Sequence, residues 1–228
     1  LFHAHDEQGA QWAYMQNLKH GSLYIITHRN NKALVNKFFS TKTYQKSRAL
    51  VGLSASIVNK LTEKFTDKHC IKIPSSPVSY PINQNKVEQI WSSHGFKFLV
   101  MQATSLEKHK GFDVTINAAK ILQEKDKPIH FLLLGSGPQE ENLRKQAEGL
   151  NNVFFMCKQE DMGTWFASAN LLIHPSHQEG LGSVILEAMA AGLPVIASNT
   201  GGIPDIIEND KTGILIEPGN AQELADAI

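Results

Sequence analysis

The chain has 228 residues, 42% hydrophobic and 19% charged, an ordinary composition for a globular protein with one large α/β domain or two smaller ones. Its two cysteines, Cys70 and Cys157, lie far apart, which argues against a disulfide framework or a zinc site and favours a reducing compartment. No apolar run is long enough to cross a bilayer, there is no signal-peptide pattern, and the scattered aromatic residues argue against nucleic-acid binding. We therefore expect a cytoplasmic protein.

The net charge of zero conceals two halves of opposite sign. Residues 1–90 carry 12 Lys and Arg against 5 Asp and Glu, whereas residues 91–228 carry 10 against 17. The basic half suits an anionic acceptor or the anionic inner face of a membrane, and a merely solvated surface explains it equally well. The basic residues considered are Lys19, Lys32, Lys37, Lys42, Lys46 and Arg48.

The first 90 residues predict an α/β segment with few strands. The pattern indicates a strand end at 1–5, helices at about 8–19 and 54–65, and strands at 23–27, 49–53 and 70–73. These are too few parallel strands for an independent doubly wound domain, so we expect an incomplete one. Three prolines within 74–81 indicate an interdomain connection. We assign 1–82 to the first domain, 83–94 to the connection and 95–228 to the second domain.

From residue 95 onward, apolar strands alternate with amphipathic helices. Strands are predicted at 96–101, 129–134, 152–156, 171–173, 194–197 and 213–216, and helices at 111–123, 138–148, 161–169, 182–191 and 220–228. This alternation predicts a parallel sheet covered on both faces, with ligands at the carboxyl ends of the strands. The segments 105–111, 135–138 and 174–182 fall at those ends. The last helix runs to Ile228, and we expect the chain to be part of a longer protein.

The stretch from His174 to Glu187 is the most informative for function. It predicts a strand, a loop that carries Glu179 and a Gly-Leu-Gly turn, and a helix in which Glu187 lies one turn from the start. Carboxylates accept hydrogen bonds from sugar hydroxyls, and the free N–H groups of a helix start bind phosphate. A purely structural alternative is an acidic residue that favours the helix dipole, with a second, exposed carboxylate on the helix.

Three further features point to the same cleft. Lys110 lies in a strand-to-helix loop and would face a diphosphate as a point charge. Gly135 and Gly137 form a tight turn near a nucleotide, although Glu140 stands where a dinucleotide fingerprint has its third glycine. His5 follows a strand, and we interpret it as facing the cleft rather than as a metal ligand, because a His-x-His pair alone rarely holds a metal.

Together these motifs resemble family 4 glycosyltransferases, which are retaining enzymes of the GT-B fold with two Rossmann-like domains. From residue 95 onward the chain resembles their nucleotide-binding domain, and residues 1–90 resemble the second half of the acceptor-side domain. The matching segments of the nucleotide-binding domain are Leu134–Pro138, His174–Ser176, Glu179–Gly182, Leu186–Ala190, Gly192–Ala197, Gly201–Pro204 and Gly213–Pro218.

The resemblance implies transfer of a sugar from a nucleotide-diphosphate sugar to a hydroxyl acceptor, with no metal or other cofactor. It places Glu179, the first glutamate of the E-x7-E pattern, beside the transferred sugar, and His5 on the same sugar from the acceptor side. Glu187 would hold the ribose, and Lys158 would lie near the base. The diphosphate would bind to Lys110 and to the backbone of Gly180, Leu181, Gly182 and Ser183.

One position departs from the family pattern. Many members carry an arginine shortly before the diphosphate lysine, and the corresponding stretch here, Ala103 to Leu106, has none. We expect glycan, lipopolysaccharide or polysaccharide synthesis. The alternatives are a nucleotide-sugar-binding fragment without turnover and a nucleotide-sugar epimerase of the GT-B fold.

Overall fold

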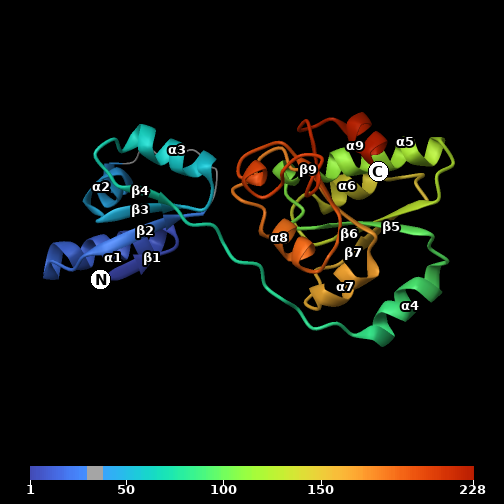
Figure 1. Cartoon of the computed structure of the whole chain (residues 1–228), viewed down its shortest axis with the longest axis horizontal. Helices are drawn as coiled ribbons and strands as arrows, with labels where there is room; N and C mark the ends of the chain where they lie inside the picture. Colours follow the sequence, from blue (N-terminus) through green and yellow to red (C-terminus); the bar gives the residue numbers. More distant parts are fainter. Residues whose placement is uncertain (30–37) are drawn as a thin grey trace. The chain divides into compact units, whose positions relative to one another are not determined.

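The computed structural model describes residues 1–29 and 38–228, which divide into two compact units (Figure 1). The first unit comprises residues 1–75 and 179–181, and the second comprises 76–178 and 182–228. Lys32 and Lys37, two of the basic residues considered above, lie outside the described residues. The remaining four, Lys19, Lys42, Lys46 and Arg48, are exposed on the first unit. In the described part of the chain, no helix combines the length and apolar character that crossing a membrane requires.

The first unit contains a four-stranded parallel sheet in the order β1-β2-β3-β4. Its described elements are β1 (Phe2–Ala4), α1 (Glu7–His20), β2 (Tyr24–His28), α2 (Phe38–Lys46), β3 (Ala49–Gly52), α3 (Ala55–Lys64) and β4 (Cys70–Lys72). Local chemistry sets the helix ends. Asp6 caps α1 by accepting the N–H of Gly9 at 2.6 Å, and Gly21 ends that helix with φ 65°. Ser54 caps α3 in the same way.

The second unit contains a six-stranded parallel sheet in the order β10-β9-β8-β5-β6-β7. Its strands are β5 (Phe98–Ala103), β6 (Ile129–Leu134), β7 (Val153–Met156), β8 (Leu171–His174), β9 (Val195–Ser198) and β10 (Ile214–Ile216). Its helices are α4 (Gln84–His94), α5 (Phe112–Glu124), α6 (Glu140–Gln146), α7 (Met162–Ser168), α8 (Ser183–Ala190) and α9 (Ala221–Ala227), with 3₁₀ turns η1 (Lys108–Lys110) and η2 (Ile203–Asp205). The predicted fold class, two α/β units with parallel sheets, is confirmed.

Helices cover both faces of this second sheet (Figure 1). On one face, α5, α6 and α9 pack on strand residues such as Val100 and Phe131, which are fully buried. On the other face, α7 and α8 pack on residues such as Met101 and Leu132. Because both faces are covered, the strands are mostly apolar, which is why their positions could be predicted from the sequence.

The connection between the units differs from the expectation. Residues 84–94 form helix α4, which packs against α7 within the second unit, and the division between the units falls after Ser75. Asn83 caps this helix by accepting the N–H of Lys86 at 3.2 Å. Val87, Ile90 and Trp91 turn toward the core of the second unit at helical spacing. The segment with the three prolines, 74–81, has neither helix nor strand.

Candidate active site

The strand order of the second sheet creates one topological switch point, between β5 and β8. From β5 the chain builds outward through β6 and β7, and then returns to the other side of β5 with β8, β9 and β10. Connections at such a point leave the sheet in opposite directions and open a crevice at the carboxyl ends of the two strands. The loops that border this crevice are 104–111, after β5, and 175–182, after β8.

Close backbone contacts join these two loops. A Cβ on Gly111, whose φ is 72°, would lie 1.8 Å from the carbonyl oxygen of Pro175, so only glycine fits. The N–H of His177 donates to the carbonyl oxygen of His109 at 2.9 Å, and the ring of His177 lies 3.2 Å from the carboxylate of Asp113. The loop that carries Lys110 is therefore held directly against the loop that leads to Glu179.

Two buried side chains, those of Gln102 and Thr115, hold η1 in place through hydrogen bonds. The amide nitrogen of Gln102 donates to the carbonyl oxygen of Lys110 at 2.8 Å, and the Thr115 hydroxyl donates to the Gln102 side-chain oxygen at 2.6 Å. Gln102 and Thr115 are both fully buried. The backbone at Lys110 is consequently positioned by the sheet and by α5.

A cavity of 440 Å³ opens at the carboxyl ends of β5, β6 and β7. Three predicted site residues, Gly135, Lys158 and Glu187, line it together. The other lining residues are Ala103, Thr104, Ser105, Leu134, Ser136, Gln159, Met162 and Val184. Thr104 and Ser105 belong to the stretch in which many family members carry arginine, so small hydroxyl side chains line the cavity there.

The Gly135–Gly137 turn is needed for close packing of two loops. A Cβ on Gly135, whose φ is 149°, would lie 2.0 Å from the carbonyl oxygen of Thr104. A Cβ on Gly137 would lie 2.6 Å from the carbonyl oxygen of Leu106. These glycines let the loop after β6 lie against the loop after β5, which sets the width of the cavity at this end. Gly135 lines the cavity, whereas Gly137 is not among its lining residues.

Glu187 enters the cavity from the second turn of α8 and is half-buried. Burial raises the pKa of its carboxyl group, and a hydrogen bond from the side chain of Tyr80 acts in the opposite direction. The pKa of Tyr80 is raised in turn, by burial and by the charge of Glu187. Sequence reasoning missed Tyr80, because nothing in the proline-rich segment indicates which helix it contacts.

The start of α8 has the predicted form. Gly182 precedes the helix with φ 92°, and no side chain of the described residues caps it. The first N–H groups of α8, like those of any α-helix, have no acceptor within the helix. Glu179 lies before this turn, and its carboxylate accepts the N–H of Gly180 at 2.9 Å. One of the backbone groups predicted to bind diphosphate is therefore engaged by Glu179. Leu181 and Gly182 are buried, whereas Ser183 is exposed.

His5 belongs to the first unit, where it is exposed at the end of β1. Its ring lies 4.0 Å from that of His3, whose Nε2 is 2.7 Å from the Thr27 hydroxyl. Burial and the neighbouring His5 both lower the pKa of His3. Among the residues that the structure describes, no group of three or more His, Cys, Asp or Glu is arranged to hold a metal ion.

Comparison with known proteins identifies the family. Residues 83–228, more than half of the chain, match the family described as Glycosyl transferases group 1. The chain belongs to this family. This glycosyltransferase-family chain is 27% identical over 220 residues to an uncharacterized glycosyltransferase of Haemophilus influenzae, covering 93% of the chain and 60% of that relative. It is 38% identical over 117 residues to sulfoquinovosyl transferase SQD2 of Arabidopsis thaliana, covering 50% of the chain and 23% of that relative.

Comparison with solved structures shows the fold of this family member. Anabaena HepE, crystallised in complex with UDP and glucose, superposes with a TM-score of 0.80 at 20% identity, over 98% of the chain and 66% of HepE. A glycosyltransferase from Rickettsia africae superposes with a TM-score of 0.81 at 21% identity, over 98% of the chain and 64% of that protein. The chain thus has the GT-B fold, with two α/β units that each contain a parallel sheet, and it spans less than two thirds of the length of these relatives.

Proposed function

We propose that the chain is the donor-binding part of a retaining glycosyltransferase that moves a sugar from a nucleotide-diphosphate sugar to a hydroxyl acceptor. One observation carries the proposal: Glu187, the second glutamate of the E-x7-E pattern, lines the cavity at the carboxyl ends of β5, β6 and β7. Family membership and the name of the Arabidopsis relative, a sulfoquinovosyl transferase, support it. We further propose a role in glycan, lipopolysaccharide or polysaccharide synthesis in the cytoplasm.

The proposed donor spans the cavity and the adjoining crevice. Lys158 borders the base, and Glu187 accepts hydrogen bonds from the ribose hydroxyls. The diphosphate lies against the start of α8, where the N–H groups and the helix dipole favour an anion, with Lys110 as the opposing cation. The N–H of Gly180, which donates to the Glu179 carboxylate in the structure, donates to the diphosphate once that carboxylate turns to the sugar.

In the proposed reaction the bond between the anomeric carbon and the diphosphate oxygen breaks, and the acceptor oxygen bonds to the same face of the sugar. The acceptor proton passes to the departing phosphate oxygen, so no separate protein base is required. Lys110 and the α8 amides stabilise the negative charge that develops on that oxygen. Glu179 and His5 are proposed to contact the transferred sugar, Glu179 as the carboxylate that stabilises positive charge at its anomeric carbon. The basic surface of the first unit is proposed to meet an anionic acceptor or membrane face.

Calorimetric titration with UDP and GDP tests the donor site. We expect one of the two to bind, and Glu187→Gln to weaken that binding by about tenfold through loss of a charged acceptor. Glu141→Gln is the matched control, because Glu141 is an exposed helical carboxylate that pairs with Lys145 at 2.8 Å and lies outside both cavities. Binding of neither nucleotide would contradict the donor site.

Activity is tested with the full-length gene product against a panel of nucleotide-sugars and hydroxyl acceptors. Transfer with retained anomeric configuration, abolished by Glu179→Gln, is the expected result. Release of an epimerised free sugar without acceptor would indicate an epimerase instead. Tight nucleotide binding with no turnover of any donor would indicate a binding module.

A further inference from the structure

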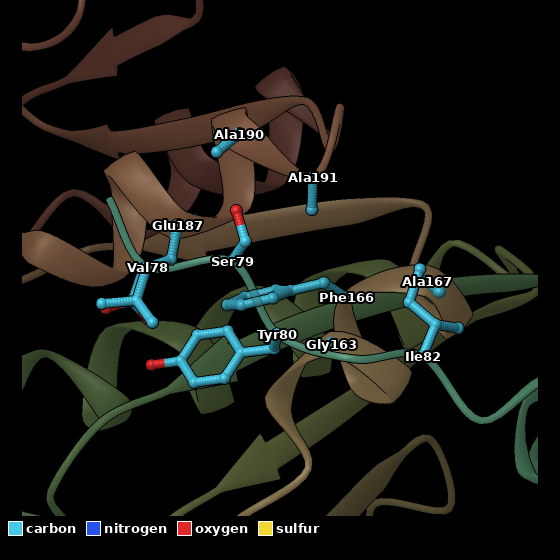
Figure 2. Close-up of a pocket in the computed structure, with 10 residues that line it drawn as sticks. All are labelled: Val78, Ser79, Tyr80, Ile82, Gly163, Phe166, Ala167, Glu187, Ala190 and Ala191. Carbon is cyan, nitrogen blue, oxygen red and sulfur yellow. The ribbon is translucent and has the colours of Figure 1, made fainter. Parts of the chain in front are cut away.

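A second, smaller cavity is also lined by Glu187. It measures 180 Å³ and is bordered by α7, α8 and residues 76–83, which we call the strap (Figure 2). Val78, Ser79, Tyr80 and Ile82 of the strap line it together with Glu187. Glu187 therefore lines both cavities, and Figure 2 shows its side chain extending from α8 toward the strap.

The strap is held against α7 by backbone as well as side-chain contacts. A Cβ on Gly163 would lie 2.5 Å from the carbonyl oxygen of Pro81 and 2.7 Å from that of Tyr80, so the strap passes as close as a glycine allows. The N–H of Asn83 donates to the hydroxyl of the buried Thr164 at 3.0 Å. The Tyr80 ring packs beside Phe166, with centroids 6.4 Å apart. These contacts fix the backbone position of Tyr80.

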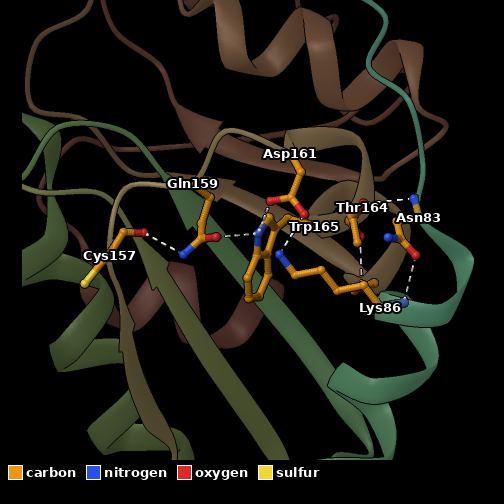
Figure 3. A network of polar contacts seen from close by, with 8 residues as sticks. Asn83, Lys86, Cys157, Gln159, Asp161, Thr164 and Trp165 are labelled. Carbon is orange, nitrogen blue, oxygen red and sulfur yellow. Dashed lines mark hydrogen bonds and ion pairs between the residues drawn. The ribbon is translucent and has the colours of Figure 1, made fainter.

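The start of α7 is in turn tied to the donor cavity (Figure 3). Lys86 pairs with Asp161 at 2.7 Å, and the indole N–H of Trp165 donates to the side chains of both Asp161 and Gln159 at 3.2 Å. Gln159 lines the 440 Å³ cavity. Helix α7 therefore contacts the strap and also lines the 440 Å³ cavity through Met162, while Trp165 on the same helix bonds Gln159 at the cavity wall.

From this arrangement we propose that Tyr80 is a positioning residue of the nucleotide site: its hydroxyl donates to the Glu187 carboxylate and orients it toward the ribose. The inference rests on the proposed function. A carboxylate has two oxygens with several lone pairs, so one bond from Tyr80 leaves acceptor sites for ribose hydroxyls. Restricting the carboxylate to one orientation lowers the entropy lost when the ribose binds.

The electrostatics support the same role. Burial raises the pKa of Glu187, and the Tyr80 hydrogen bond lowers it again toward the ionised form that accepts ribose hydroxyls. The titratable residues that line the two cavities, in the described part of the chain, are Tyr80, Lys158 and Glu187. Removing the Tyr80 hydroxyl should therefore raise the pKa of Glu187 and move the loss of nucleotide binding at acid pH to higher pH.

The test compares UDP with 2′,3′-dideoxyuridine diphosphate, or the guanosine pair if GDP is the nucleotide that binds. The wild-type chain should prefer the ribose form by about tenfold, and Tyr80→Phe should reduce that preference by about threefold or more. Tyr44→Phe is the matched control, because the Tyr44 hydroxyl also has a side-chain partner, His28 at 2.9 Å, but lies in the first unit. It should leave the preference unchanged.

Two further measurements separate positioning from a structural effect. In a Glu187→Gln background, Tyr80→Phe should no longer alter the preference, because the carboxylate that it orients is gone. In the single variant Tyr80→Phe, the loss of UDP binding at acid pH should occur at a higher pH than in the wild-type chain. Circular dichroism checks that the variant, which keeps its ring against Phe166, is folded.

The outcomes distinguish the two proposals. If the wild-type chain binds neither UDP nor GDP, the donor site itself is wrong. If it binds and prefers the ribose form, but Tyr80→Phe changes neither the preference nor the pH at which nucleotide binding is lost, only the role of Tyr80 is overturned. If Tyr80→Phe has the same effect with and without Glu187, its effect is structural and the positioning role is likewise overturned.

Discussion

At the scale of single residues, Glu187, the proposed ribose ligand, lies where burial disfavours the ionised form of its carboxyl group. Burial on α8 raises the pKa of its carboxyl above the ordinary value of 4.5, so the folded chain holds a proton more tightly there than the unfolded chain does. Stability therefore falls as pH rises through the window above 4.5, and the whole cost is present once the group is ionised in the folded state.

Glu187→Gln should accordingly stabilise the protein while weakening nucleotide binding. We expect its thermal midpoint at pH 8 to exceed that of wild type by about 2 °C, with the difference vanishing near pH 4, where the wild-type carboxyl is largely protonated. Thermal melts followed by circular dichroism at both pH values measure this. A Glu187→Gln variant that is less stable at pH 8 would mean that Glu187 makes contacts outweighing its burial.

At the scale of elements, the pairing of the η1 loop with the loop after β8 depends on Gly111. Gly111→Ala should lower the free energy of unfolding by about 2–4 kcal/mol, since the new Cβ meets the Pro175 carbonyl oxygen at 1.8 Å and forces the two loops apart. Urea titration measures the loss, and calorimetry should show weaker nucleotide binding because Lys110 moves with its loop.

Gly149→Ala provides the matched control for that substitution. Gly149 also has a positive φ, 82°, but a Cβ there meets nothing within 4 Å. The control should cost only the strain of a left-handed alanine, about 1–2 kcal/mol, and leave nucleotide binding unchanged. Equal losses in the two variants would show that conformational strain, rather than the contact between the loops, accounts for the effect of Gly111→Ala.

The elements that could be predicted from the sequence are those that their own residues determine, without distant contacts. The buried strands β5 and β6 are apolar except for Gln102 and His130, and Gly182 marks the start of α8, so both signals are local. Helix α2 was missed because Ser40, Thr41 and Thr43 are poor helix formers. Distant contacts stabilise it: the Tyr24 hydroxyl donates to the Thr43 carbonyl oxygen at 2.6 Å, and Ser40 donates to Glu7 at 3.0 Å.

The candidate site divides in the same way. Gly135 directly follows β6, and Glu187 lies on α8, the helix that comes after β8. Because strand ends converge on one edge of a parallel sheet, the sequence predicted that both residues lie near one cavity, which they line, and their roles in binding stay predictions. Tyr80 could not be predicted, because its partner on α8 depends on how the strap crosses α7 at Gly163. Helix α4 was interpreted as a connection because the preceding prolines outweighed the helical spacing of its few apolar residues.

At the scale of the whole molecule, the two units have separate sheets. The cavity of 440 Å³ is lined by residues of the second unit, and so is the smaller cavity. In the proposal, a nucleoside diphosphate without its sugar binds mainly to groups of the second unit, which are Lys110, Lys158, Glu187 and the start of α8. The backbone N–H of Gly180, grouped with the first unit, is the exception. Ligand binding stabilises the folded form of whatever part it contacts.

UDP, or GDP if that is the ligand, should therefore protect the second unit selectively from hydrogen exchange. At a nucleotide concentration about one hundred times Kd, amides of β5 and β6 that exchange by unfolding of the unit should slow by about one hundredfold, and those of β2 and β3 should be unchanged. Mass spectrometry of peptic peptides resolves the two sheets. Glu187→Gln at the same nucleotide concentration should show about tenfold less protection, which ties the effect to the site. Equal slowing of both sheets would show instead that the two units unfold together, and that the donor site stabilises the first unit as well.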